Sequence, residues 1–440
     1  MITIEDLYKL YLSHPIVSTD TRKLPEGCLF FALRGANFDG NKYAGAALEA
    51  GAAYAIIDEA DQLIDERTIL VPDALQALQL LAAHHRRALG IPVIAITGTN
   101  GKTTTKELTA AVLSQSYHLL YTEGNLNNHI GVPLTLLRLT QEHQLALIEM
   151  GASKPGDIAE LCAIAQPNYG LITNIGQAHL EGFGSLEGVR RTKGELYDSV
   201  RAREGILFYH EEDEVLRQMS LGTERISYGS SPKAYVQGVA SPSTGESLFL
   251  HFSWSCPILE MSAREVQTQL VGDYNLANAL AAIAIGLYFD VPSDKIDEAL
   301  TSYCPSNSRS QLIHSERGNQ IIADAYNANP SSMRTALSNF LAIEPALRPR
   351  IVILGDMNEL GASSHEAHQE LYQKLSSTTT PPLEIYLCGP HWQEELGDQP
   401  QVYPNVEELI AHIEAHPITK SLILVKGSNS IHLGKLLPYL

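Results

Sequence analysis

An apolar segment that leads into a glycine-containing loop and then a helical stretch constrains this chain more than any other feature. Residues 91–96 read Ile-Pro-Val-Ile-Ala-Ile, a pattern that predicts a short buried strand. The next residues, 97–105, read Thr-Gly-Thr-Asn-Gly-Lys-Thr-Thr-Thr, and a helical pattern runs from Thr103 to about Gln115. A strand, a tight loop and a helix start in this order direct backbone N–H groups at a bound phosphate.

The loop also carries the side chains that a triphosphate site needs. Gly98 and Gly101 let the backbone approach a ligand closely. Lys102 offers a positive charge to the β and γ phosphates, and Thr103 offers a hydroxyl to Mg²⁺. The general pattern GxxxxGK[ST] has its first glycine where this chain has Ile96, so the match is partial. Nucleotide binding is favoured over an ordinary strand-to-helix turn because the strand and helix are both in place.

The remainder of the 440 residues alternates short apolar runs with helical stretches. This alternation predicts an α/β fold, and the length allows more than one domain. We expect three domains, at residues 1–84, 85–303 and 304–440. The central domain is predicted to hold a parallel P-loop sheet with a small antiparallel part within residues 205–270. The last domain is predicted to hold a doubly wound, Rossmann-like sheet.

Polar residues follow two further apolar runs of the central block. Glu149 ends the run at 145–148, while Asn174 and His179 follow the run at 170–173. The carboxyl ends of parallel strands gather at one edge of a sheet, so these groups are expected near the phosphate loop, where Glu149 could hold a hard cation. A solvated strand-end Glu149 and a structural His179 are the alternatives. The loop at residues 125–128 (Asn-Leu-Asn-Asn) suits either a substrate contact or a set of turn caps.

The amino-acid composition limits the kinds of partner and the cellular location that we expect for this chain. The net charge is −19, which repels a phosphate backbone and disfavours nucleic acid as a partner. The five cysteines are far apart and form no CxxC pair, a distribution typical of a reducing compartment and not of a zinc ribbon. The first residues lack the pattern of a signal peptide, and no apolar run is long enough to span a membrane. We therefore expect a cytoplasmic protein.

Taken together, these segments resemble the Mur ligase family of peptidoglycan synthesis. The family's phosphate loop has the form TGxxGKTxxK, which residues 97–106 match, and it too lacks the first glycine of the general pattern. The resemblance covers essentially the whole chain. The other matching segments lie at residues 18–22, 38–41, 124–133, 149–152, 178–185, 193–195, 324–333, 354–361 and 426–428.

The resemblance implies roles for individual residues. Glu149, His179 and Lys193, the last as a carbamate, would ligate Mg²⁺ together with Thr103 at two metal sites. Lys102, Lys193 and His179 would be catalytic. Tyr274 and Asn41 stand where the family commonly has His. The ATP-binding set would be Thr97, Gly98, Thr99, Asn100, Gly101, Lys102, Thr103, Thr104, Asn275, Asn278, Arg309, Asp324, Tyr326 and Asn327. The UDP-substrate set would be Ser18, Asp20, Arg22, Asp39, Asn125, Asn127 and Asn128.

The activity that the resemblance implies is an ATP-dependent ligation. D-Alanyl-D-alanine would be joined to UDP-N-acetylmuramoyl-tripeptide through an acyl phosphate, by a monomer that uses ATP and two Mg²⁺ ions. A sister ligase that adds another amino acid, a folate polyglutamylating enzyme and a P-loop kinase or ATPase switch are the enzymatic alternatives. A non-catalytic partner subunit of an amidotransferase is the other, although its four-cysteine zinc ribbon is missing here. The third residue of the tripeptide, lysine or diaminopimelate, is left open.

Overall fold

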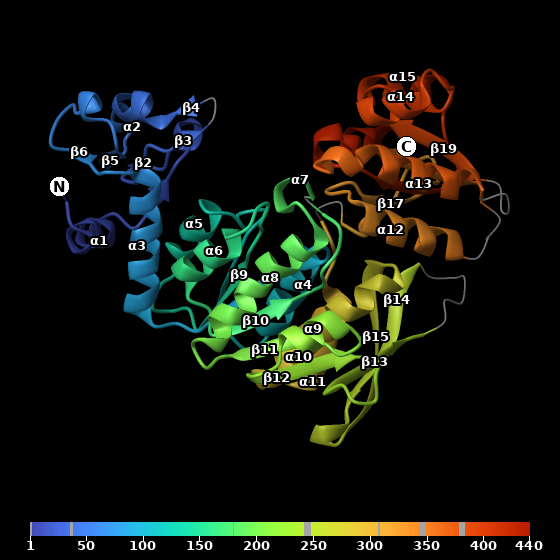
Figure 1. Ribbon diagram of the computed structural model, residues 1–440, viewed down its shortest axis with the longest axis horizontal. Coiled ribbons are helices and arrows are strands. Elements are labelled where there is room, and N and C mark those ends of the chain that lie inside the picture. Colours follow the sequence, from blue (N-terminus) through green and yellow to red (C-terminus); the bar gives the residue numbers. More distant parts are fainter. Residues whose placement is uncertain are drawn as a thin grey trace.

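The computed structural model describes residues 2–35, 38–178, 180–241, 248–306, 309–343, 348–377 and 383–440. Within these ranges the strands form three larger sheets and one two-stranded pair, and helices cover the sheets (Figure 1). The three larger sheets consist mainly of parallel strands, which confirms the predicted α/β class. No helix in the described ranges is both long and apolar enough to cross a membrane.

The first sheet is small and entirely parallel, in the order β1-β2-β5-β6. Helix α2 packs on one face, and α1 and α3 pack on the other. A separate antiparallel pair, β3 and β4, lies beside it. The bounds are α1 Ile4–Ser13, β1 Val17–Ser18, β2 Leu29–Phe31, β3 Arg34–Gly35, β4 Phe38–Asp39, α2 Ala44–Glu49, β5 Tyr54–Ile57, β6 Thr68–Leu70 and α3 Ala74–Leu89.

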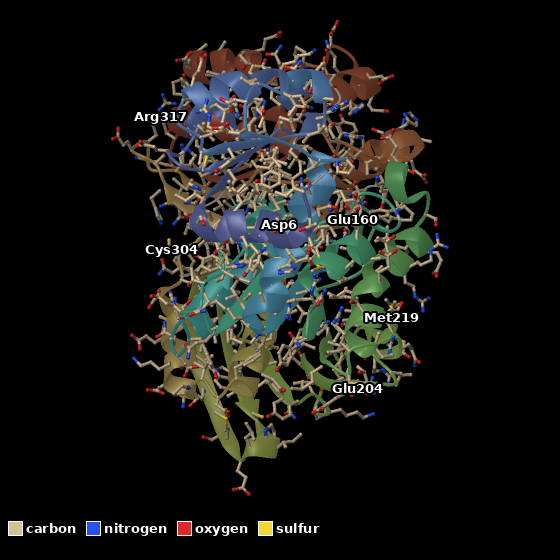
Figure 2. All side chains as sticks on the ribbon, turned by 90° about the vertical axis from the view of Figure 1, so that its left-hand side faces the viewer. Asp6, Glu160, Glu204, Met219, Cys304 and Arg317 are labelled. Carbon is tan, nitrogen blue, oxygen red and sulfur yellow. The ribbon has the colours of Figure 1, made fainter. Side chains whose placement is uncertain are left out.

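Helix α3 connects this sheet to the next one. Its N-cap is Asp73, and it ends at Gly90, whose φ of 67° stops the helix. His85 and Arg86 bond to backbone carbonyls of the central region, with His85 Nε2 2.9 Å from the Leu139 oxygen. Figure 2 looks onto this side, where α1 with Asp6 lies across α3 and Glu160 lies nearby. The predicted boundary after residue 84 falls inside α3, and the division at residues 84 and 303 stays a prediction.

The central sheet has the order β15-β14-β13-β12-β11-β10-β7-β9-β8. Strands β8 to β13 are parallel, whereas β13, β14 and β15 pair antiparallel, as expected for residues 205–270. Apolar side chains fill both faces, with α4, α10 and α11 on one and α5, α6 and α8 on the other. The strands are β7 Val93–Thr97, β8 Leu119–Tyr121, β9 Leu145–Glu149, β10 Tyr169–Ile172, β11 Ile206–His210, β12 Glu224–Gly229, β13 Val236–Ala240, β14 Phe249–Cys256 and β15 Met261–Val271. The helices are α4 Lys102–Leu113, α5 Gly131–Leu136, α6 Asp157–Ala165, α7 Leu180–Phe183, α8 Leu186–Arg201, α9 Glu214–Met219, α10 Leu276–Tyr288 and α11 Ser293–Ser302.

The third sheet has the order β16-β17-β21-β18-β19-β20, parallel except for the β16–β17 pair. Helices α12, α13 and α14 cover one face and α15 covers the other, which is the doubly wound arrangement predicted. Val271 at the end of β15 joins the core beneath α12, so the central and third sheets share apolar contacts. The bounds are β16 Gln311–His314, β17 Gln320–Asp324, α12 Pro330–Ala342, β18 Arg350–Gly355, α13 Ser364–Ser376, β19 Leu383–Cys388, α14 Pro390–Leu396, β20 Val402–Tyr403, α15 Val406–Ala415 and β21 Leu422–Lys426.

Candidate active site

A cavity of about 840 Å³ opens where the carboxyl ends of the central strands face the third sheet. Its walls come from the phosphate loop, the 125–128 loop, the start of α10 and the segment after β17. Ligands commonly bind at such strand ends in parallel α/β sheets. The predicted site residues that line it are Thr99, Asn100, Gly101, Lys102, Thr103, Thr104, Asn125, Asn127, Asn128, Glu149, Asn275, Asn278, Arg309, Asp324, Tyr326 and Asn327.

The phosphate loop needs both of its glycines. Gly98 has a φ of +145° and Gly101 a φ of +77°, which side-chain-bearing residues rarely adopt. A Cβ at Gly98 would overlap the Thr173 hydroxyl, and one at Gly101 would lie 2.6 Å from Asn278 Oδ1. Thr97, the last residue of β7, is fully buried behind the loop and donates its hydroxyl to the Met150 oxygen. Thr97 and Gly98 therefore fix the conformation of the loop and do not line the cavity.

The loop's backbone donors divide into two groups. The N–H groups of Thr99 and Asn100 bond to the oxygens of Asn174, each at 3.0 Å. In the other group, the N–H groups of residues 101–104, at the start of α4, have no acceptor within the helix because a helix leaves its first donors free. The sequence predicts that the whole loop faces the phosphate; in the structure the N–H groups of Thr99 and Asn100 are already bonded within the protein, and phosphate binding at the helix start stays a prediction.

Lys102 lies over the loop. Its Nζ donates to the carbonyl oxygens of Gly98 at 2.8 Å and Thr99 at 3.0 Å. Burial of the ammonium group is the main cause that lowers the pKa of Lys102 to about 8, and Arg309 adds to the effect while Glu149 opposes it. An ammonium so placed gains from an anionic ligand, because a phosphate would replace the water that it has lost.

Glu149 ends β9 at the cavity, as its position after an apolar run predicts, and is almost completely buried. Its Oε1 accepts hydrogen bonds from Thr103 Oγ1 at 3.2 Å and Asn127 Nδ2 at 2.7 Å. Its backbone N–H donates to Thr122 Oγ1, and Thr122 in turn accepts a bond from Lys106 Nζ. The second carboxylate oxygen, Oε2, is buried and has no hydrogen-bond partner among the described residues.

A buried carboxylate oxygen without a donor is the feature expected of a cation ligand. The described residues hold no group of three or more His, Cys, Asp or Glu that could bind a metal ion unaided. Mg²⁺ usually takes one or two carboxylates and completes its shell with substrate phosphates and water. The residues present therefore fit a Mg²⁺ ion that arrives with a nucleotide. His179, the second predicted ligand, lies outside the described residues.

Lys193 lies on α8 and is almost completely buried. Burial lowers its pKa to about 7, and the charge of Lys102 lowers it further, against the opposite pull of Asp157, Glu195 and Glu149. Its Nζ lies 5.6 Å from the centre of the Phe183 ring. Lys193 is not among the residues that line the cavity. A substantial fraction of its amine is thus neutral near physiological pH.

The start of α10 is tied to the segment that leads into the third sheet. Asn278 accepts a bond from Thr105 Oγ1 and donates to Asn275 Oδ1, both at 3.0 Å. The hydroxyls of Tyr274 and Ser310 are 2.7 Å apart, and burial raises the pKa of the tyrosine. Tyr274, which replaces a common His, is thus a link between α10 and the third sheet; an adenine contact of Asn275 and Asn278 stays a prediction.

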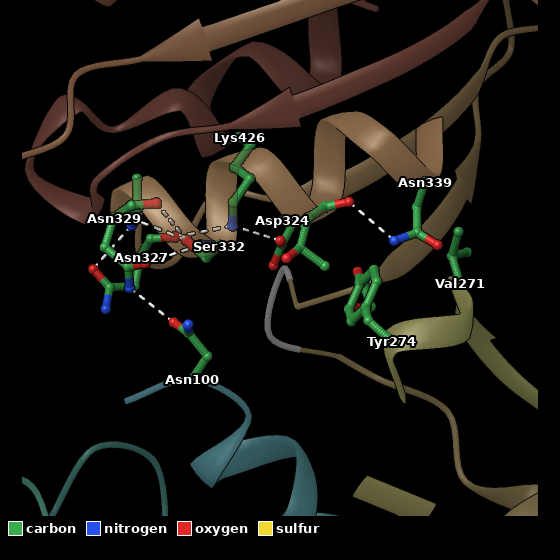
Figure 3. A network of polar contacts seen from close by, with 12 residues as sticks. Asn100, Val271, Tyr274, Asp324, Asn327, Asn329, Ser332, Asn339 and Lys426 are labelled. Atoms are coloured by element: carbon green, nitrogen blue, oxygen red, sulfur yellow. Dashed lines mark hydrogen bonds and ion pairs between the residues drawn. The ribbon is translucent and has the colours of Figure 1, made fainter. Parts of the chain in front are cut away.

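The third sheet brings a buried ion pair to the cavity (Figure 3). Lys426 Nζ lies 2.6 Å from Asp324 Oδ2 and donates to the Asn327 oxygen at 3.1 Å. The guanidinium carbon of Arg309 lies 3.9 Å from the centre of the Tyr326 ring, and Arg309 Nε is buried with no bond among the described residues. Sequence reasoning missed Lys426 as a site residue. The available signal was a charged residue directly after the apolar run of β21, the same signal that identified Glu149.

The predicted UDP-substrate residues fall in two places. Ser18 lies in the first sheet, Asp20 and Arg22 follow β1, and Asp39 ends β4 beside that sheet; none of the four lines the cavity. The Arg22 guanidinium beside Asp20 lowers the pKa of that carboxyl to about 2. Asp39 accepts bonds from the backbone and the side chain of Asn41. These local bonds leave a substrate role as a prediction.

Asn41 itself is fully buried, and its amide also bonds to Asp58 at 2.8 Å. Position 41, which is commonly His in the family that the sequence resembles, has a structural role in this chain. In the other group, Asn128 Oδ1 accepts the N–H groups of Ile130 and Gly131 at the start of α5. Asn128 thus stabilises the turn before α5 and also lines the cavity, so its substrate contact stays a prediction, while Asn127 supports Glu149. Asn125 lies on the cavity wall.

Models of three protein domains match the chain. The Mur ligase middle domain matches residues 96–286 and contains the phosphate loop. The domain described as Mur ligase, glutamate ligase domain, matches residues 308–429, and the Mur ligase family catalytic domain matches residues 15–86. The matches cover all three sheets.

Individual proteins match over nearly the whole length. The UDP-N-acetylmuramoyl-tripeptide–D-alanyl-D-alanine ligase of Bacillus subtilis is 33% identical, over 96% of this chain and 92% of the relative. A crystal structure of MurF from Acinetobacter baumannii superposes with a TM-score of 0.83 at 31% identity, covering 96% of this chain and 92% of that one. MurF from Thermotoga maritima in complex with ADP superposes with a TM-score of 0.82 at 25% identity, covering 96% of each chain.

Proposed function

The chain belongs to the Mur ligase family, and we propose that it joins D-alanyl-D-alanine to UDP-N-acetylmuramoyl-tripeptide while converting ATP to ADP and phosphate. Relatives that carry this activity in their names match it over more than nine-tenths of their length. The observation that carries the chemistry is the buried Glu149 Oε2, which has no partner among the residues that the structure describes and lies beside Lys102 and the start of α4. The product is the pentapeptide precursor of peptidoglycan.

The reaction proceeds in two transfers. An oxygen of the tripeptide carboxylate attacks the γ-phosphorus of ATP, and the bond to the β,γ-bridging oxygen breaks, so ADP leaves and an acyl phosphate forms. The amine of D-alanyl-D-alanine, in its neutral form, then attacks the acyl carbon. The carbon–oxygen bond to phosphate breaks, the nitrogen loses a proton, and the amide is formed.

The chain's own groups neutralise charge and fix geometry in the first transfer. Lys102 and the free N–H groups of residues 101–104 bind the phosphate oxygens. Glu149 Oε2 and the Thr103 hydroxyl would hold Mg²⁺, with Asn127 keeping the carboxylate in orientation and Thr122 fixing the backbone of Glu149. When bound, Mg²⁺ withdraws charge from the phosphate being transferred. The adenine is assigned to the start of α10, at Asn275 and Asn278.

A second cation site involves Lys193. A neutral lysine amine reacts with carbon dioxide to give an anionic carbamate, whereas an ammonium cannot react. The lowered pKa of Lys193 supplies the neutral form at physiological pH. We assign the carbamate of Lys193, with His179, to this second Mg²⁺ ion. Release of one carbon dioxide from Lys193 on acidification, detected by mass spectrometry of the intact protein, tests this assignment.

The UDP moiety of one substrate and the incoming dipeptide are assigned to different parts of the protein. The UDP moiety is assigned to Ser18, Asp20, Arg22 and Asp39, with Asn125 nearer the peptide end. The incoming dipeptide is assigned to the cavity wall of the third sheet, where Arg309, Asp324, Tyr326 and Asn327 lie. A cytoplasmic monomer remains the expectation for the working form.

The decisive experiment uses purified protein with ATP, Mg²⁺ and UDP-N-acetylmuramoyl-tripeptide ending in either lysine or diaminopimelate. Addition of D-alanyl-D-alanine should yield a product heavier by one dipeptide minus water, with one phosphate released per bond formed. The preferred tripeptide identifies its third residue. A product that forms only when a free amino acid replaces the dipeptide would establish a sister ligase. Phosphate release that needs neither substrate would contradict the ligase function.

A further inference from the structure

The N-terminus of α12 rests directly on the phosphate loop, although more than 200 residues separate them in sequence. Three side chains form a closed set of hydrogen bonds there, and Figure 3 shows Asn100 and Asn329 facing each other. Asn329 Nδ2 donates to Asn100 Oδ1 at 2.7 Å. Asn100 Nδ2 donates to Ser331 Oγ at 2.9 Å, and Ser331 Oγ donates to Asn329 Oδ1 at 2.7 Å.

The contact joins two elements that are each fixed locally. Asn329 is the N-cap of α12, where it accepts the Ser332 N–H, and it is almost completely buried. On the opposite side, the Asn100 carbonyl accepts bonds from Thr173 Oγ1 and Asn174 Nδ2. Both the oxygen and the nitrogen of the Asn100 amide are thus directed away from its own sheet and toward the third sheet.

Close packing surrounds these bonds. A Cβ at Gly176 would lie 3.2 Å from Ser331 Oγ and 3.5 Å from the Thr99 methyl group. The N–H of Gly176 donates to Thr99 Oγ1 at 3.0 Å, so the loops after β7 and β10 form one continuous surface under α12. A shift of the phosphate loop therefore changes the surface on which α12 rests.

The position of α12 also fixes the cavity wall of the third sheet. The segment between Asp324, at the end of β17, and Asn329 carries the dipeptide-side residues, and Lys426 holds this segment by its bonds to Asp324 and the Asn327 oxygen. The three-residue set thus connects the phosphate loop directly to the segment that carries these groups.

We propose that Asn329 and Ser331 are positioning residues that dock the third sheet on the phosphate loop through the Asn100 side chain. They hold the dipeptide wall over the acyl phosphate and keep water from it. This inference rests on the proposed ligase function, because its consequence is the fate of the acyl phosphate. Loss of docking exposes that intermediate to hydrolysis, since water competes with the amine.

The chain offers a matched pair of variants for the test. Ser331→Ala removes the hydroxyl that bonds across to Asn100 and leaves the Asn329–Ser332 capping bond in place. Ser332→Ala, one residue away, removes a hydroxyl that bonds only to Asn329 backbone atoms. Both changes remove one oxygen near the start of α12, so a general effect on stability appears in both variants.

The measurements are phosphate released per peptide bond formed, kcat, and the KM for the UDP-tripeptide. We expect Ser331→Ala to lower kcat roughly tenfold, the effect of losing one hydrogen bond of ordinary strength. Its phosphate-to-peptide ratio should rise severalfold above one, with the KM for the UDP-tripeptide unchanged. Ser332→Ala should retain a ratio near one. Equal ratios in the two variants would overturn the proposal.

Two further measurements separate this proposal from the ligase function. Small-angle scattering of the wild type and of Ser331→Ala, each with and without ADP and Mg²⁺, needs no ligation. Ser331→Ala should be less compact than the wild type with and without nucleotide; equal compactness of the two proteins in both conditions would contradict docking. In addition, Asn100→Ala combined with Ser331→Ala should weaken compaction no more than the stronger single change, because both remove the same contact. Additive effects would contradict a shared contact.

Discussion

Two sheet edges face each other across the cavity, and they handle charge in opposite ways. The central edge carries Glu149 with one oxygen unpartnered among the described residues, and an amine at Lys102 whose pKa is lowered to about 8. The third edge carries Asp324 and Lys426 as a direct ion pair at 2.6 Å. The central edge is electrostatically incomplete, whereas on the third edge the charges of Asp324 and Lys426 neutralise each other before any ligand arrives.

The difference indicates a division of labour. An incomplete edge gains binding energy from a cation and a triphosphate, because each supplies the partner that a buried charge lacks. The Asp324–Lys426 pair can approach the central edge without bringing an unbalanced charge into a cavity that excludes water. Substitutions on each of the two edges test this contrast.

Lys102→Ala removes the main cation of the central edge. We expect turnover to fall by roughly 10²–10³-fold, about 3–4 kcal/mol, comparable to the loss of a major transition-state donor. Affinity for the UDP-tripeptide, measured by calorimetry without ATP, should stay close to that of the wild type. Turnover within a few-fold of the wild type would show that the central edge does not depend on this charge.

Lys426→Met breaks the ion pair of the third edge and leaves Asp324 without its cation. We expect the free energy of unfolding to fall by about 2–3 kcal/mol, below the range for fully buried pairs because Asp324 is 18% exposed. Denaturant titration measures the loss. Lys426→Met with Asp324→Leu should recover part of it, since no unpaired charge remains. A single variant as stable as the wild type would remove the contrast between the edges.

The pH dependence of the stability of Lys193→Met tests whether the buried amine of Lys193 has a lowered pKa. The pKa of Lys193 is about 7 in the folded protein and near 10.5 when unfolded, so unfolding takes up a proton between these values. This penalty is complete below pH 7 and disappears above about pH 10.5. The variant should therefore be more stable than the wild type at pH 7. Its advantage should shrink by up to about 1.4 kcal/mol per pH unit as the pH rises from 7.

Denaturant titrations of both proteins at pH 7, 8 and 9, in buffers free of carbon dioxide and nucleotide, provide the comparison. A constant difference between variant and wild type across this range would show that Lys193 titrates normally. A variant less stable than the wild type at pH 7 would contradict the burial of an uncompensated amine.

Asn127→Ala tests whether Asn127 keeps the Glu149 carboxylate oriented for binding a cation. Without its donor to Oε1, the Glu149 carboxylate should lose orientation, and half-maximal activity should need roughly tenfold more Mg²⁺, about 1.4 kcal/mol. Asn128→Ala is the control, because it removes a cap of α5 and leaves Glu149 untouched. A raised KM for the UDP-tripeptide at unchanged Mg²⁺ demand would favour the substrate role that the sequence suggested.

Much of this site could be predicted from the sequence, because the patterns that indicate it lie within short segments of the chain. The strand at 91–96 appears as β7, and the helix expected from Thr103 begins at Lys102, since residues that contact each other in a strand-loop-helix unit are neighbours in sequence. Glu149 was identified by the same logic, as the polar end of an apolar run. Lys426 satisfied that logic equally but received no role, because nothing in its own segment indicated Asp324 as its partner.

Local sequence patterns were sufficient to predict the α/β class, the phosphate loop and the edge of the sheet at which the site lies. Periodicity and loop chemistry decide these, and both act between residues a few positions apart. The tertiary structure alone decided that Asn127 serves Glu149, that Asn128 caps a helix, and that Asn100 faces Asn329. An asparagine amide can bond equally well to a ligand, a carboxylate or another amide. Only the fold determines which of these lies within 3 Å, and for Asn100 that partner lies 229 residues away in the chain.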